Sequence, residues 1–389
     1  MINKELNSVY NQLFGSDIKS SYKAPARVNL IGEHIDYNGG KVLPATIGLY
    51  TYGYFSFRDD NEIHLYSLNT RKLVIRKLDD IDYNEENGWG SYPLGVVRIL
   101  NLTKNQVNKG FNIMYASNIP LGSGLSSSAA ILDLTAYILN NEFKLGYDNK
   151  EISLIGVRAE REYCGLSCGI MDEAAIALGK KNKAILIDCA KYEYEYLPFE
   201  LGDYRLLVMK TNKPRSLTDS KYNERVNECN QALSILKKQY NIENITELKS
   251  EELNNIEKYL NNDVLFRRVR HVVTENERVY QFKDALIKGD VKLLGKLFNE
   301  SHRSLRDDYE VTGIHLDSLT DLARTEKGCL GARMTGAGFG GCAIAIVHKD
   351  SVEHFKSSVN SGYYKALHIK SEILECEIPD GVGIEEWVK

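Results

Sequence analysis

Long apolar runs are missing from this sequence, in which no stretch reaches 18 apolar residues in succession. A helix that spans a bilayer needs about 20 such residues, so we expect no membrane partner. The first ten residues, MINKELNSVY, also lack the charged segment followed by an apolar one that marks a secretion signal. We therefore expect a cytoplasmic protein.

Cysteines are too few and too dispersed for a disulfide framework, because the chain has seven of them, an odd number, in 389 residues. Cys164 and Cys168 are four positions apart, but no second Cys or His pair follows at a spacing typical of zinc sites. We expect reduced thiols, with these two explained by packing, and no structural metal.

An excess of positive charge is missing as well. The net charge of −4 and the pI near 6.1 argue against nucleic acid as a main partner. Two common kinase signatures are also absent. Gly179 and Gly295 each precede a lysine, but neither continues as the Walker sequence G-x-x-x-x-G-K-[ST]. His302 and Arg303 are followed by Ser304 and not by the aspartate of the protein-kinase H-R-D element.

The length of 389 residues exceeds what a single hydrophobic core usually serves, so we expect two domains around a cleft. We place the boundary where the segment LPFELGDYR leads into the apolar strand LLVM. The predicted domains are residues 1–205 and 206–389.

The first informative motif is APARVNLIGEHIDYNGG, at residues 24–40. Val28 to Ile31 form a short, largely apolar segment that we predict to be a buried strand. Glu33, His34 and Asp36 follow at the strand end, where carboxylates and imidazole suit the hydroxyls of a sugar. An ordinary solvated hairpin end is the plainer alternative.

The second motif, PLGSGLSSSAA at residues 120–130, places glycines and serines before a long apolar segment. Gly122 and Gly124 would let main-chain N–H groups approach an anion, and the helix that we predict next adds the positive end of its dipole. Asp133, Tyr137 and Asn140 interrupt that apolar segment at the spacing i, i+4, i+7, on one face of the predicted helix. The pattern is typical of a phosphate-binding loop, although a Gly/Ser loop alone also suits a flexible turn.

The third motif, MTGAGFGGCAIAIV at residues 334–347, has four glycines between Gly336 and Gly341. It contains the dinucleotide-binding pattern G-x-G-x-x-G, but that pattern requires a following helix. Cys342 to Val347 is a short apolar run that predicts a strand, so we reject dinucleotide binding. A strand, glycine loop and strand suit a close approach to a ligand or to a neighbouring catalytic loop, and equally a tight hairpin.

Together these motifs resemble the three motifs of the GHMP small-molecule kinases, and the first resembles the galactokinase signature. The similarity covers nearly the whole chain, continuing through residues 169–181, 185–189, 215–225, 267–278 and 300–311. The resemblance implies an α+β fold with a mixed-sheet N-terminal domain, an antiparallel-sheet C-terminal domain and an active site in the cleft between them. It implies phosphorylation of D-galactose by ATP on the anomeric hydroxyl, giving galactose 1-phosphate. We expect a monomer.

Asp172 is the candidate that receives the proton of the acceptor hydroxyl. It lies in GIMDEAAIALG, where Met171, Ala174 and Leu178 belong to an apolar helical stripe, and a helix start favours an ionised carboxylate. An unperturbed carboxylate, with a pKa of about 4, is a weak base for a sugar hydroxyl, so we expect its role to be mainly the orientation of that hydroxyl. The resemblance pairs Asp172 with Arg27, which would stabilise charge on the transferring group. A plain helix-start carboxylate is the alternative.

The metal positions of the family fall on Ser128 and Glu160, and the implied cofactor is Mg²⁺. This ion takes hard oxygen ligands and keeps several waters, so two protein groups suffice. Without the resemblance, Glu160 would be a solvated carboxylate paired with Arg158 or Arg161. The resemblance also implies that one loop wraps the ATP phosphates and that Ser67 contacts the nucleotide. The loop residues are Gly122, Ser123, Gly124, Leu125, Ser126, Ser127 and Ser128.

For the sugar, the resemblance assigns Glu33, His34 and Asp36 to ring binding, with a hydroxyl from Tyr222 and a close backbone approach at Gly169. Asp36 can accept hydrogen bonds from two adjacent hydroxyls. Such pairing can reject an epimer strongly, because a misplaced hydroxyl leaves protein groups without partners.

The sequence departs from the usual galactokinase pattern at three positions. It has Ala26 where the pattern has Gly, Ile35 where the pattern has Thr, and Glu173 where the pattern has Gln. Glu173 follows Asp172 directly and should point elsewhere. N-acetylgalactosamine kinases of the family also resemble GEHIDY, so a kinase for N-acetylgalactosamine or another aldose is one alternative. A galactose-sensing regulator without turnover is the other, although known sensors lack part of the Ser-Ala run that is complete here at 128–130.

Overall fold

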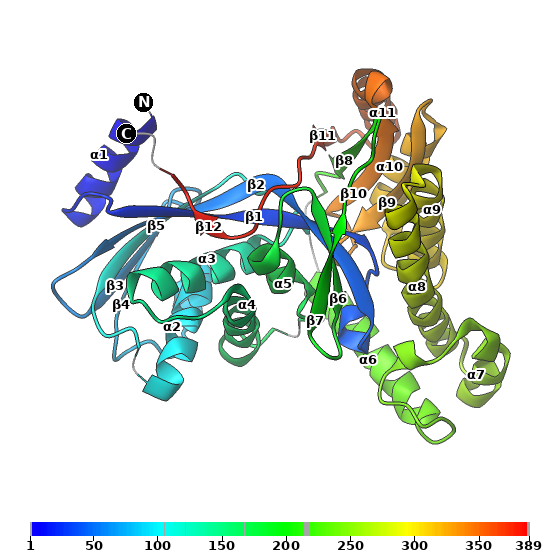
Figure 1. The fold of residues 1–389 in the computed structure, drawn as a ribbon, viewed down its shortest axis with the longest axis horizontal. Coiled ribbons are helices and arrows are strands. Elements are labelled where there is room, and N and C mark those ends of the chain that lie inside the picture. Colours follow the sequence, from blue (N-terminus) through cyan, green and yellow to red (C-terminus); the bar gives the residue numbers. More distant parts are fainter. Residues whose placement is uncertain (1, 105, 121, 167, 214–217, 387–389) are drawn as a thin grey trace.

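The computed structural model describes residues 2–104, 106–120, 122–166, 168–213 and 218–386, so part of the segment 215–225 lies outside it. Within these residues the chain forms two β-sheets, one of eight strands and one of four, with helices packed on both (Figure 1). The predicted α+β class is confirmed.

The larger sheet is mixed, as predicted. Its strand order is β12-β1-β2-β5-β3-β4, and β6 extends from β2 to β7. The pair β3–β5 is parallel, whereas the neighbours of β1 and β2 are antiparallel to them. The strands are β1 (Ser20–Ile31), β2 (Lys41–Phe57), β3 (Glu62–Ser67), β4 (Lys72–Lys77), β5 (Phe111–Ser117), β6 (Lys183–Asp188), β7 (Glu193–Pro198) and β12 (Gly383–Ile384).

Helices cover this sheet, and two of them carry predicted site residues. The helices before β6 are α1 (Ile2–Phe14), α2 (Ser91–Lys104), α3 (Ser127–Glu142), α4 (Asn149–Arg158) and α5 (Met171–Leu178). Both α3 and α5 pack on β1 and β2. A π-helical turn, η3 (Ala159–Tyr163), continues α4. The predicted helices that follow the second motif and contain Asp172 are therefore confirmed as α3 and α5.

The smaller sheet is antiparallel throughout, with strand order β11-β8-β10-β9. Its strands are β8 (Tyr204–Lys210), β9 (Cys329–Thr335), β10 (Cys342–His348) and β11 (Glu372–Glu375). The third motif is thus a strand, glycine loop and strand, which confirms the rejection of a dinucleotide-binding unit. The helices of this half are α6 (Thr218–Leu236), α7 (Leu253–Leu260), α8 (Asp263–Lys288), α9 (Val291–Asp307), α10 (Gly313–Thr325) and α11 (Val352–Leu367).

The two halves of the chain are interleaved at the sheets. The helix α8 contacts β1, β2 and β7, and β12 near the end of the chain pairs with β1. The predicted division after residue 205 falls within β8 and stays a prediction.

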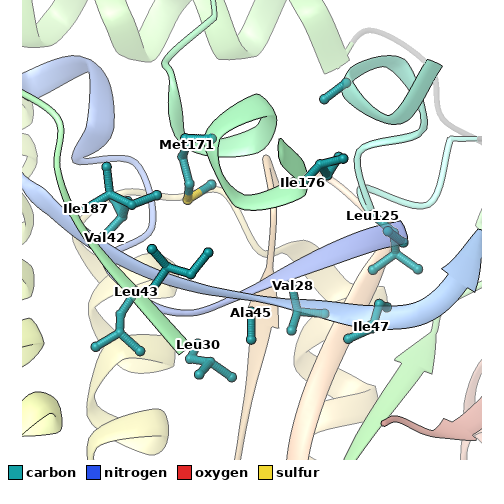
Figure 2. Close-up of a cluster of buried hydrophobic side chains, with 14 of the residues drawn as sticks. Val28, Leu30, Val42, Leu43, Ala45, Ile47, Leu125, Met171, Ile176 and Ile187 are labelled. Atoms are coloured by element: carbon teal, nitrogen blue, oxygen red, sulfur yellow. The ribbon is translucent and has the colours of Figure 1, made fainter. Parts of the chain in front are cut away.

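The core continues directly beneath the segments that carry the motifs. Figure 2 shows apolar side chains of β1 and β2 gathered below the loop residue Leu125 and the helix residues Met171 and Ile176. Leu125 is 1% exposed and Ile176 is fully buried. Because burial of such side chains contributes about 1.5–3 kcal/mol each, the loop and α5 are anchored to the long strands from below.

Two further expectations from composition can be compared with the structure. None of the seven cysteines forms a disulfide bond in the structure. Among the described residues, none of the helices combines the length and the apolar character that a membrane crossing requires.

Candidate active site

The three sequence motifs meet at one cavity of about 430 Å³. Its walls include side chains of the first motif, the glycine loop of the second, and Gly336 and Ala337 of the third. The predicted residues that line it are Arg27, Glu33, His34, Asp36, Gly122, Gly124, Ser126, Ser127, Ser128, Glu160, Gly169, Asp172 and Tyr222. A larger cavity of about 890 Å³ lies under residues 376–386 and contains no predicted site residue.

An ion pair between Arg27 on β1 and Asp172 in the first turn of α5 lies at the wall of the cavity. Arg27 Nε donates to Asp172 Oδ1 at 2.8 Å and Nη2 donates to Oδ2 at 2.7 Å. The arginine is 4% exposed, whereas the aspartate side chain is 32% exposed. Such a bidentate pair holds the carboxylate in one orientation while leaving it accessible to a ligand in the cavity.

The glycine loop is tied to the same pair. Arg27 Nη1 donates to the carbonyl of Gly124 at 2.6 Å, and the Ser126 hydroxyl donates to Asp172. Ser126 has φ 61° and precedes α3, but its side chain makes no capping hydrogen bond to that helix. The first N–H groups of α3 thus lack this partner and border the cavity, which is the arrangement expected of a phosphate-binding helix start.

The third motif supports this loop through close backbone contact. A Cβ atom at Gly336 would lie 2.7 Å from the carbonyl oxygen of Gly124, and Gly336 has φ +83°. Only glycine meets both conditions without strain. The expected approach of this motif to a neighbouring catalytic loop is therefore what the structure contains.

Glu33 and His34 are buried at the other side of the cavity. Glu33 accepts hydrogen bonds from Asn29 Nδ2 at 2.5 Å and from the Gly336 N–H group. Burial raises the pKa of Glu33, although Arg333 opposes the shift. His34 Nδ1 lies 2.9 Å from the Tyr37 hydroxyl, and burial lowers the pKa of His34 to about 3. The imidazole is thus neutral, so one ring nitrogen can accept a hydrogen bond while the other donates.

Asp36 lies against Gly169. A Cβ atom at Gly169 would overlap the Asp36 carboxylate, so the predicted close backbone approach is present in the structure. Burial and the charge of Asp172 raise the pKa of Asp36 to about 7. The ring of Tyr222 lies 5.7 Å from that of His34, which brings a phenol to the same group.

Three predicted nucleotide contacts have side chains that do not line the cavity. Ser67 ends β3, is 7% exposed, and accepts a hydrogen bond from the Thr70 N–H group at 3.2 Å. Ser123 donates to the carbonyl of Pro120 at 2.7 Å, and Leu125 packs into the core. The side chains of Ser123 and Leu125 thus shape the loop, and their contacts with a nucleotide stay predictions.

Ser128 and Glu160 both line the cavity and bring hydroxyl and carboxylate oxygens to it. Glu160 does not pair with its neighbouring arginines among the described residues. Arg158 bonds Glu162 at 2.7 Å, and Arg161 Nε donates to the Cys168 carbonyl at 2.9 Å. The donor set fits a hard divalent cation such as Mg²⁺, which needs few protein oxygens.

The sequence reasoning missed a set of buried residues that hold the first motif from behind. The N–H groups of Gly32 and Glu33 donate to Glu275 Oε1 at 2.9 and 3.3 Å. His271 Nε2 lies 3.0 Å from the carbonyl of Glu33, and Arg333 Nη1 donates to the carbonyl of Leu30 at 2.7 Å. One signal was present in the sequence. The polar residues His271 and Glu275 lie four apart on the side of α8 that also carries the buried residues Val272 and Val279.

The sequence analysis also did not assign several other cavity-lining residues to the site. Among them are Tyr92, Leu166, Cys168, Met171 and Asn223. They come from α2, from the loop before α5, from α5 itself and from α6, so their proximity is a product of the tertiary fold.

Three parts of the chain match models of known protein families. Residues 92–180 match the N-terminal domain of GHMP kinases, and residues 282–365 match the C-terminal domain. Residues 8–57 match the galactose-binding signature of galactokinases, which contains the first motif.

Curated relatives and a solved structure are similar over almost the full chain. A galactokinase of Clostridium tetani is 44% identical over 97% of this chain and 96% of its own length. A galactokinase of Enterococcus faecalis is 43% identical over 95% and 96%. The crystal structure of a Lactococcus lactis galactokinase complexed with galactose has a TM-score of 0.95 and 39% identity, covering 98% of this chain and all of the other.

Proposed function

This chain belongs to the galactokinases of the GHMP kinase family, and on that basis we propose that it transfers the γ-phosphoryl group of ATP to the anomeric hydroxyl of D-galactose. The products are galactose 1-phosphate and ADP. The observation that carries the proposal is the Arg27–Asp172 pair, which lies between the glycine loop and the buried Glu33–His34–Asp36 segment.

The geometry of this pair supports a mechanism based on positioning. In phosphoryl transfer, a bond forms between the acceptor oxygen and phosphorus while the bond from phosphorus to the leaving ADP oxygen breaks. Asp172 is oriented to hold the acceptor hydroxyl and to receive its proton as the new bond forms. Arg27, held between Asp172 and the Gly124 carbonyl, supplies positive charge beside the transferring group.

The glycine loop and the start of α3 supply N–H groups for the phosphates of ATP. Ser128 and Glu160 are the residues that we propose to hold Mg²⁺. When bound, this ion neutralises phosphate charge.

The buried segment on the other side supports recognition of a sugar. Glu33 and Asp36 offer carboxyl oxygens as acceptors, and the neutral His34 ring is held in one orientation by the Tyr37 hydroxyl at Nδ1 and the Ala337 carbonyl at Nε2. A site built from polar groups that are largely shielded from water penalises a sugar whose hydroxyls are misplaced. This supports selection for one epimer.

Two departures from the galactokinase pattern do not reach the cavity. Ile35 is fully buried and packs against Gly40, and Glu173 is fully buried behind the cavity wall. An adjoining pocket of about 370 Å³, lined in part by Tyr37 and Tyr222, could receive an added sugar substituent, which keeps N-acetylgalactosamine as the alternative acceptor. The cytoplasmic location and the monomeric state stay proposals from the sequence.

The test is ADP formation with Mg-ATP and each of five sugars: galactose, N-acetylgalactosamine, galactosamine, glucose and arabinose. We expect turnover with galactose to exceed that with the other sugars, and the Asp172→Ala variant to be inactive. Preference for N-acetylgalactosamine would overturn the substrate and retain the mechanism. Binding of galactose without turnover would identify a sensor.

A further inference from the structure

A group of acidic side chains lies in and behind one wall of the cavity. Glu160 in η3, Cys168 in the following loop and Glu173 in α5 each offer one ligand atom, and these atoms lie within 4.8 Å of one another. Glu160 and Cys168 line the cavity, whereas Glu173 is fully buried behind them. The group can therefore be reached from the cavity, although most of it is shielded from solvent.

The carboxylate of Glu173 has no suitable partner in this position. Among the described residues, neither of its oxygens has a hydrogen-bond partner other than the neighbouring Glu160 carboxyl group, and the oxygens of the nearby buried Asp133 have none. The nearby Arg161 donates to the carbonyl of Cys168 and not to these carboxylates. A buried carboxylate aimed into a group of acids is stabilised by a proton or by a cation.

The chemistry of the donors selects the kind of cation. A thiolate is a soft ligand, which Mg²⁺ and Ca²⁺ avoid, whereas Zn²⁺ and Co²⁺ accept thiolate and carboxylate together. Three protein ligands with a fourth position open to the cavity are typical of zinc centres that keep a water or a substrate. Ligand atoms of a tetrahedral zinc centre lie about 3.5 Å apart, so a small closure of these side chains would complete the site.

We propose that Glu160, Cys168 and Glu173 form a binding site for a borderline-soft divalent transition metal, Zn²⁺ above all, which enters from the catalytic cavity. Metal binding converts the Cys168 thiol to a thiolate and the Glu173 carboxyl group to a carboxylate, and both protons pass to solvent. Cys168, which the sequence alone assigned to packing, is then a ligand. The usual galactokinase pattern has a glutamine at this position. The charged ligand Glu173 therefore distinguishes this chain from that pattern.

The site shares Glu160 with the proposed Mg²⁺ site, and this has one consequence for activity. We expect Zn²⁺ to inhibit the kinase, and to do so less as Mg²⁺ is raised. This consequence alone rests on the proposed function, because occupancy of the site can be measured without turnover.

The test uses the full chain, freed of metal by a chelator and titrated with Co²⁺ as a spectroscopic probe. We expect one equivalent of Co²⁺ to produce a near-ultraviolet absorption band from thiolate-to-cobalt charge transfer. Zn²⁺ should displace Co²⁺ and so abolish this band, and excess Mg²⁺ alone should not generate the band. Absence of the band in the wild-type chain would overturn the proposal.

Three variants assign the ligands. Cys168→Ser should abolish the band, and Cys164→Ser, which changes a thiol outside the ligand group, should retain it. Glu173→Gln should weaken Co²⁺ binding by about tenfold or more. Persistence of the band in Cys168→Ser, or unchanged affinity in Glu173→Gln, would overturn the assignment. Circular dichroism verifies folding, and Glu173→Gln decides the question alone if Cys168→Ser does not fold.

Discussion

The two sides of the catalytic cavity are built in different ways. On the phosphoryl side, Arg27 and Asp172 contact each other directly through a charged bidentate pair within the N-terminal half of the chain. On the sugar side, Glu33 and its neighbours are held by Glu275 and Arg333, which lie more than 240 residues further along the chain. The phosphoryl side is centred on one charged pair whose partners are 145 residues apart, and the sugar side depends on several contacts with segments that are more distant still.

This difference has an electrostatic counterpart. Although burial opposes it, the Arg278 charge helps to lower the pKa of Glu275 to about 2, so this support is anionic. In contrast, burial and the Asp172 charge raise the pKa of Asp36 to about 7. The charge of Glu275 should therefore stay constant near neutral pH. Asp36, in contrast, should gain or lose its proton in this range.

The largest expected effect is on the phosphoryl side. Asp172→Asn should lower kcat by about 10³-fold, because the amide cannot receive the proton and cannot form the charged pair with Arg27. The galactose Kd should change little. Steady-state rates and calorimetric sugar binding measure the two quantities, with Asp203→Asn, an exposed carboxylate, as control. A loss of kcat below tenfold would contradict the role of Asp172.

The next effect is steric and falls on the sugar side. Gly169→Ala should raise KM for galactose by about 100-fold, equivalent to about 2.7 kcal/mol, because the new methyl group displaces Asp36. KM for ATP should change far less. Gly48→Ala is the matched control, because a Cβ at Gly48 meets no atom within 4 Å. Equal changes in both KM values would show that Gly169 does not act through the sugar segment.

A smaller effect is expected from the distant support. Glu275→Gln leaves one amide oxygen for the Gly32 and Glu33 N–H groups but removes the charge that pairs with Arg278. Loss of a buried, charge-assisted interaction of about 2 kcal/mol would raise galactose KM by about 30-fold. Kinetics with each substrate varied in turn measure this change, and Asp284→Asn on the exposed face of α8 is the control. An effect on ATP alone would contradict the prediction.

The smallest effect is that of pH on sugar binding. With a pKa of about 7, Asp36 is mainly a carboxylate at about pH 8 and mainly protonated at about pH 6. Protonation removes an acceptor for sugar hydroxyls, so the galactose Kd should rise by about tenfold as pH falls over this range. Calorimetry in the absence of ATP measures this Kd at each pH. Asp172→Asn should move the midpoint to lower pH, and a Kd that stays constant would exclude Asp36 as the titrating acceptor.

Much of the candidate site was predictable because its residues lie in short local patterns. Gly122 and Gly124 lie in the loop before α3, and Asp172 lies in the first turn of α5, as the motif around each of them indicated. Glu275 could not be assigned in this way. Its function depends on which segment α8 meets, and no local pattern encodes that partner.

The loop of the second motif shows the same limit in detail. From the sequence, Ser123 and Leu125 belonged with the glycines as phosphate-loop residues. In the structure, Leu125 enters the core and the Ser123 hydroxyl bonds the Pro120 carbonyl. Residue type predicted the loop, but only packing decided which of its side chains face the cavity.

The sequence by itself determined the family, the strand and helix that present Arg27 and Asp172, and the glycines that the turns require. These follow from backbone preferences and hydrophobic periodicity, which act over a few residues. The tertiary structure alone decided that Glu173 is buried beside Glu160 and Cys168, and that Glu275 supports the sugar segment. Burial and charge proximity arise between segments that are remote in sequence, so they exist only once the chain has folded.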